Sequence, residues 1–121
     1  METHVEKINV ILDTIGQDIA ERESVANAAM QTLEKMQPSD VEYKEANLQF
    51  SANSFVAAYL RHIKDTVKDK DYQSLKRLEQ CIRFHRYQQH TKGALDDHRD
   101  ISLGQATVAV ILGGYVERFF K

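Results

Sequence analysis

The sequence is short of the residues that make turns and cross-links. Its 121 residues include one proline, one cysteine, five glycines and no tryptophan. A β domain of this length would need many turns built from Gly, Pro, Asn and Asp, so this shortage argues against one. A single cysteine, Cys81, excludes a disulfide within the chain and indicates a reducing compartment, so we expect a cytoplasmic protein.

Long apolar runs are also missing. The longest one, near the C-terminus, is far too short to span a bilayer, and we expect no membrane span. The first twenty residues carry acidic side chains throughout, which is unlike a signal peptide.

Good helix formers are plentiful: Ala, Leu, Glu, Lys, Gln and Arg recur along the chain. Hydrophobic residues make up 42% and charged residues 28%, the usage of an ordinary globular domain. There is no repeat, low-complexity tract or flexible linker. The composition therefore predicts one all-α domain over residues 1–121.

Four helical segments are predicted. The first covers residues 5–36 and ends before Pro38, with Gly16 as a point where it can bend. Ser39 and Glu42 match a capping box that would start the second helix, which reaches about residue 67. The third covers 71–92, with Gly93 as the residue that ends it, and the fourth covers 103–120.

Short connections between these segments make neighbouring helices antiparallel. The sequence thus predicts an up-down-up-down four-helix bundle whose first two helices are the longest. The overhang of two long helices would leave apolar residues uncovered. We therefore expect a homodimer or a complex with another protein, and a non-enzymatic interaction or assembly role.

Two apolar stretches are candidates for that interface. One is a heptad-like seam in the first helix, with apolar residues spaced three and four apart; the other is the aromatic C-terminus. Gly113 and Gly114 precede these aromatics inside a predicted helix, where they cost about 2 kcal/mol together, so close approach of another helix or a kink is expected there. The candidate interface residues are Ile8, Leu12, Ile15, Ile19, Tyr115, Phe119 and Phe120.

The alternative function rests on charge. Residues 1–48 hold ten acidic and four basic side chains, whereas residues 49–92 hold four acidic and nine basic ones. Cations and one aromatic residue share an outward sector of the third helix, a pattern that suits phosphates and stacked bases. We call this sector the basic stripe; it consists of Lys76, Arg83, Arg86, Tyr87 and His90. It would bind nucleic acid or an acidic protein partner, such as the acidic first helix of a second copy.

Evidence for catalysis is weaker. Arg83 with His90, or Arg86 with His90, could serve a metal-independent ribonuclease, in which the His transfers a proton. Helical ribonucleases of the HEPN class pair an Arg with a His in this way, but Phe84 follows Arg83 where that class has a polar residue, so the pattern does not place the chain there.

No metal or cofactor is expected. The five histidines lack the i, i+3 or i, i+4 pairing that a helical metal site needs. Asp96, Asp97 and Asp100 stand near His98, but Asp residues before a helix are usually caps. Cys81 has no second cysteine near it, and we expect it to pack as a small apolar side chain.

Overall fold

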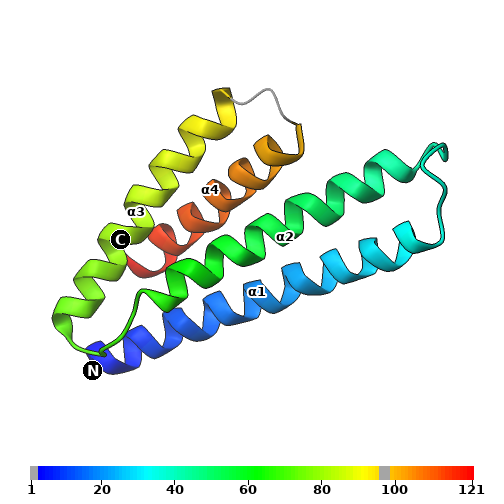
Figure 1. Ribbon diagram of the computed structural model, residues 1–121. Helices are drawn as coiled ribbons and strands as arrows, with labels where there is room; N and C mark the ends of the chain where they lie inside the picture. Colours follow the sequence, from blue (N-terminus) through cyan, green and yellow to red (C-terminus); the bar gives the residue numbers. More distant parts are fainter. Residues whose placement is uncertain (1–2, 96–98) are drawn as a thin grey trace.

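The computed structural model describes residues 3–95 and 99–121, and the side chains of residues 3–90 and 103–121. Its four helices are α1 (His4–Glu34), α2 (Tyr43–Asp65), α3 (Tyr72–Leu95) and α4 (Arg99–Phe119). Successive helices run in opposite directions (Figure 1), and no strand occurs among the described residues. The predicted all-α four-helix bundle is confirmed.

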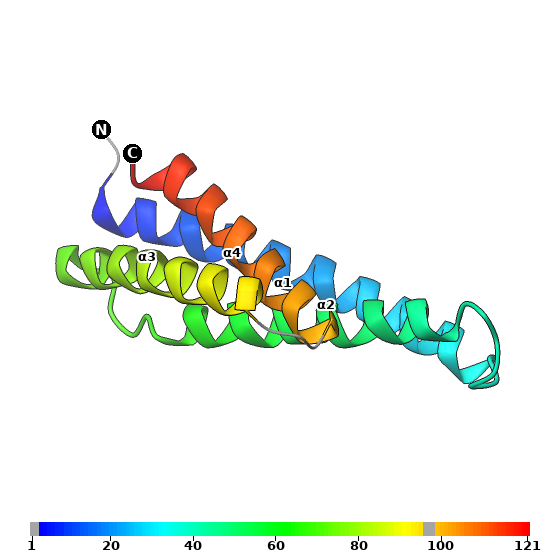
Figure 2. The same cartoon turned by 90° about the horizontal axis from the view of Figure 1, so that it is seen from above.

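The helices form two antiparallel hairpins stacked as two layers. α1 pairs with α2, and α3 pairs with α4. The hairpins meet mainly where α2 lies on α4, while α2 and α3, although consecutive, approach each other little. Figures 1 and 2 show the α3–α4 hairpin inclined across one end of the longer α1–α2 hairpin.

The hairpins differ in reach. α1 has 31 residues and is the longest helix, as predicted, whereas α2, with 23, is slightly shorter than α3, with 24. The α1–α2 hairpin nevertheless extends well past α3 and α4 at one end (Figure 2), because the second hairpin is set toward the other end. α1 passes Gly16 without a break.

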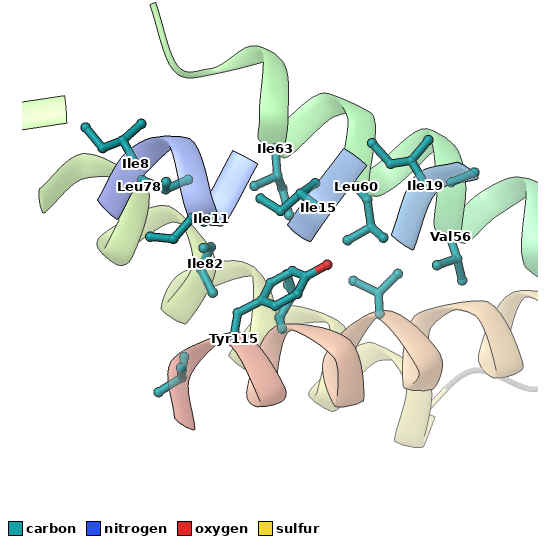
Figure 3. Packing of buried hydrophobic residues seen from close by; sticks show 14 of the residues in the cluster. Ile8, Ile11, Ile15, Ile19, Val56, Leu60, Ile63, Leu78, Ile82 and Tyr115 are labelled. Atoms are coloured by element: carbon teal, nitrogen blue, oxygen red, sulfur yellow. The ribbon is translucent and has the colours of Figure 1, made fainter. Parts of the chain in front are cut away.

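A single apolar cluster holds the two layers together. In α1 it is built on Ile8, Ile11 and Ile15, all fully buried, which share the cluster with Leu60 of α2 and Leu112 of α4. Figure 3 shows these isoleucines above the second layer, with the ring of Tyr115 rising between the layers. Burying large aliphatic side chains of this kind stabilises the fold by roughly 2 kcal/mol each.

Helix ends correct three of the sequence predictions. The capping box is at Thr3 and Glu6, not at Ser39, because α2 begins later with Glu42 as its N-cap and no side-chain cap. The backbone between them is held by a turn in which the Asp40 carboxylate accepts a hydrogen bond from Gln37 N–H at 2.9 Å.

The other two corrections concern the second hairpin. α3 continues past Gly93 to Leu95, so this glycine does not end it, and α4 begins at Arg99, four residues before the predicted start. Asp71 caps α3 by accepting a hydrogen bond from Ser74 N–H at 2.8 Å, which lowers the pKa of its carboxyl. Within the described part of the chain, no helix combines the length and apolar character needed to cross a membrane.

Candidate interaction groove

A groove runs between α3 and α4 on the face turned away from α1 and α2. Its volume is about 610 Å³. Four of the five predicted stripe residues line its α3 wall, and α4 supplies the floor and the opposite wall. We call this surface the α3–α4 groove; its lining residues are Arg83, Arg86, Tyr87, His90, Ala109, Val110, Gly113, Gly114 and Glu117.

The groove is open because two of its lining residues, Gly113 and Gly114, have no side chain. A Cβ added at Gly114 would have no neighbour within 4 Å, and one at Gly113 would meet only the guanidinium of Arg86, at 3.2 Å from Nε. Among the described residues nothing comes within 4 Å of that position at Gly114, and only the Arg86 side chain comes close at Gly113, so the expected close approach of another helix is not seen at Gly114. Val110, on the same side of α4, is 74% exposed. The floor of the groove is thus formed by small or apolar residues and is open to solvent.

The charge of the groove is less one-sided than the sequence suggests. Arg83 donates to the Glu79 carboxylate at 2.9 Å and to the carbonyl oxygen of Phe120 at 3.0 Å, so it secures the C-terminal end of α4. Glu117, on the α4 side, has a lowered pKa, mainly through its hydrogen bond from Lys121 and also through the positive charge of Arg86. The groove is therefore weakly basic with one acidic edge.

Lys76 is not part of the groove. Its ammonium stands 4.9 Å from the ring centroid of Tyr72, beside α1 and the C-terminus. Lys76 and Arg83 share a helical sector, but seven residues separate them by about 10 Å along the axis. A helical wheel discards that axial distance, which is why the sequence grouped them.

The predicted interface residues serve the chain's own core. Ile8, Ile15, Ile19 and Tyr115 are buried within it, and Leu12, Phe119 and Phe120 pack against it half-buried. Tyr115 also donates to the Asp18 carboxylate at 2.5 Å, a contact between α4 and α1 that no sequence pattern predicted. These residues are therefore occupied within the chain, and the proposed interface would have to lie elsewhere.

The free end of the α1–α2 hairpin offers such a surface. We call residues 20–52 the arm: the last turns of α1, the connection and the first turns of α2. None of them belongs to the shared core cluster, and the buried apolar residues among them are Ala26, Leu48 and Ala52. Val25, Met30 and Val41 are exposed. The arm holds six acidic and three basic side chains.

A polar seam joins α2 to α3. The hydroxyl of Tyr59 lies 2.5 Å from Nδ1 of His85, and the rings of His85 and His62 meet edge-on with centroids 6.3 Å apart. Burial, and then the neighbouring His62, lower the pKa of His85, whereas burial raises the pKa of Tyr59. Both pKa shifts favour the neutral forms of the two groups, in which the Tyr59 hydroxyl can donate to Nδ1 of His85.

This seam predicts a pH dependence of stability. Because the pKa of His85 is lower in the folded chain than in the unfolded one, its contribution is fully present above the unfolded pKa of about 6.5 and is lost as the pH falls below it. We expect the free energy of unfolding, measured with urea, to decrease from pH 7 to pH 5 less steeply in His85→Gln than in the unmodified protein.

His4 lies outside the seam on the exposed start of α1, so His4→Gln is the matched control and should keep the original slope. Equal slopes in His85→Gln and the unmodified protein would contradict the assignment.

Two further candidates are placed by the structure. Cys81 is half-buried, and burial raises the pKa of its thiol, as expected for a packed cysteine. No group of three His, Cys, Asp or Glu side chains placed to hold a metal ion occurs among the residues whose side chains are described. The Asp96–Asp100 cluster around His98 lies outside those residues.

No protein-family model, curated protein or solved structure matches this chain.

Proposed function

We propose that the protein is a non-enzymatic interaction or assembly protein that binds a protein partner through the α3–α4 groove, in a reducing, cytoplasmic compartment. The observation that carries the proposal is the pair of glycines in the groove floor. Gly113 and Gly114 cost α4 about 2 kcal/mol together relative to alanine. Gly113 leaves room only for the Arg86 guanidinium of α3, and at Gly114 no described residue would lie within 4 Å of an added Cβ.

A protein partner would account for those glycines. Small residues let another backbone come close, and the groove provides apolar contact at Val110 with cations and Tyr87 on its wall. Interface centres favour this mixture of aromatic and Arg side chains around apolar surface. The acidic edge at Glu117 suits a partner with mixed charge better than a continuous phosphate backbone.

A photo-crosslinking residue in place of Val110 tests the proposal in cells. We expect irradiation to give adducts that contain protein, because Val110 faces the open groove. The matched control carries the same crosslinker at Val10, an exposed valine on α1 that is remote from the groove. An equal adduct yield at both positions, or none at Val110, would sink the proposal.

The alternative is a small nucleic-acid-binding subunit. It is supported by Arg83, Arg86, Tyr87 and His90 lining one groove. Its affinity would fall steeply with salt, since phosphate contacts release counterions. Nucleic-acid adducts at Val110 in the crosslinking experiment would favour it over a protein partner.

A further inference from the structure

We infer that the occupant of the α3–α4 groove is the arm of a second copy of this chain, in a two-fold symmetric dimer that makes this contact twice. The inference rests on the proposed function and names its partner. It depends on three independent features. They are the step where the α1–α2 hairpin extends past the α3–α4 hairpin, the continuation of a packing face onto the arm, and the opposite charges of the arm and the groove.

The step comes from the unequal hairpins. The α3–α4 hairpin covers one end of the α1–α2 layer and leaves the arm uncovered (Figures 1 and 2). Consider a second copy related to the first by a two-fold axis at the step, the place where the α3–α4 hairpin ends and the arm begins. The α3–α4 hairpin of the second copy would then lie beside that of the first copy, in the same layer. Its arm would then lie over the outer face of the first hairpin, where the groove is. The same operation brings the first arm onto the second groove, so the assembly closes as a dimer.

The face of the α1–α2 layer that receives α4 continues onto the arm. Asp18 marks this face on α1 through its hydrogen bond to Tyr115. Val25 stands seven residues later, on the same side of the helix, and is 40% exposed. On α2, Phe55 contacts the Gly104 position of α4, and Leu48 stands seven residues earlier on the same side. Leu48 is buried within the arm, so the part of this face that its own chain leaves uncovered is apolar at Val25.

Charge selects the groove over a second arm as the surface that covers this face. The arm holds six acidic and three basic side chains, whereas the lining of the groove holds Arg83 and Arg86 against the single carboxylate of Glu117. Packing arm on arm would bring two acidic surfaces together. Packing arm on groove brings opposite charges together, which favours association and fixes its register. Glu21, one turn before Val25 on α1, is exposed and in no ion pair among the described residues.

Light scattering coupled to size exclusion tests the inference, with protein mass taken from refractive index because tryptophan is absent. We expect a dimer at low salt that shifts toward monomer as salt rises. Val25→Arg should raise the dimer Kd by about tenfold or more, since it puts a cation against a basic groove. Val10→Arg is the matched control: Val10 lies on the same helix, is exposed to 42% against 40% for Val25, and should leave the dimer intact.

Gly114→Leu is a second variant that does not depend on a folding defect. Its side chain enters open space and is a better helix former than glycine, so the monomer should fold at least as well while the filled groove loses the dimer. A monomer at low salt, a dimer strengthened by salt, or equal effects of Val25→Arg and Val10→Arg would each overturn the inference.

The crosslink at Val110 separates this inference from the proposed function. Adducts between two copies, mapped to residues 20–52 of the second, support both. Adducts to a different protein overturn the second-copy inference and leave the proposed function standing. Absence of any protein adduct overturns both.

Discussion

Truncating Leu60 to alanine is expected to lower the free energy of unfolding by about 3 kcal/mol, and the same truncation of Leu48 by only about half as much. Both leucines lie on α2 and are buried. Leu60 belongs to the cluster shared by both hairpins, so its loss leaves a cavity walled by side chains from both layers. Leu48 packs in the arm, outside that cluster, where the two helices can close on a smaller side chain.

Urea denaturation followed by far-ultraviolet circular dichroism measures both variants. High salt and low protein concentration keep the proposed dimer apart, so that each value refers to one chain. An equal loss at the two positions would contradict the view that the arm lies outside the core. The slope of the free energy with urea should be unchanged, because neither truncation alters the surface exposed on unfolding by much.

The second large effect is an opposite response of two glycines in α4 to the same substitution. Gly114→Ala is expected to raise the free energy of unfolding by about 1 kcal/mol, because alanine favours the helix and its Cβ meets nothing within 4 Å. Gly104→Ala is expected to lower it by about 1 to 2 kcal/mol. Its Cβ would lie 2.7 Å from Cδ1 of Phe55 and 3.2 Å from Cγ, and moving a packed ring costs more than the helix gains.

Thermal and urea denaturation of the two variants give the comparison directly, each serving as the control for the other. Stabilisation by both substitutions would mean that Phe55 yields without cost and that α4 is not held against α2 at Gly104. Destabilisation by both would mean that Gly114 is already covered in the monomer, which would remove the open floor of the groove.

Much of the fold could be predicted from the sequence because periodicity reports directly on burial. The spacing of Ile8, Ile15 and Ile19 predicted a helix with one apolar face, and the structure buries all three, although in the chain's own core and not at the interface predicted for them. Ile11 was missed because a heptad seam describes contact with one neighbour. α1 packs against α2 in its own layer and against the second hairpin, so its buried stripe is wider than a heptad seam, and Ile11 is fully buried while Leu12 is half-buried.

The groove could be predicted only in part. Residues close together on one helix, such as Arg83 and Arg86, are related by local geometry, and the structure keeps them together. Their contacts come from α4 and from the residues that follow it. Arg83 donates to the carbonyl oxygen of Phe120, and the Arg86 guanidinium lies against Gly113, which has no side chain. Such contacts depend on how the hairpins dock, which helical periodicity does not encode. The same holds for Asp18 and Tyr115, which are 97 residues apart in the chain.

The arm is where we expect the native chain to open first. Fraying from its tip exposes little more than Ala26, Leu48 and Ala52, whereas opening at the other end would expose the fully buried isoleucines of α1. Such fraying would stop where the hairpin enters the shared core, at Ile19 of α1 and Val56 of α2. A molecule that binds the arm therefore has to suppress these opening fluctuations. Part of the binding free energy then offsets the conformational entropy that the arm loses on binding. The affinity is therefore lower, and dissociation faster, than the buried surface area alone would suggest.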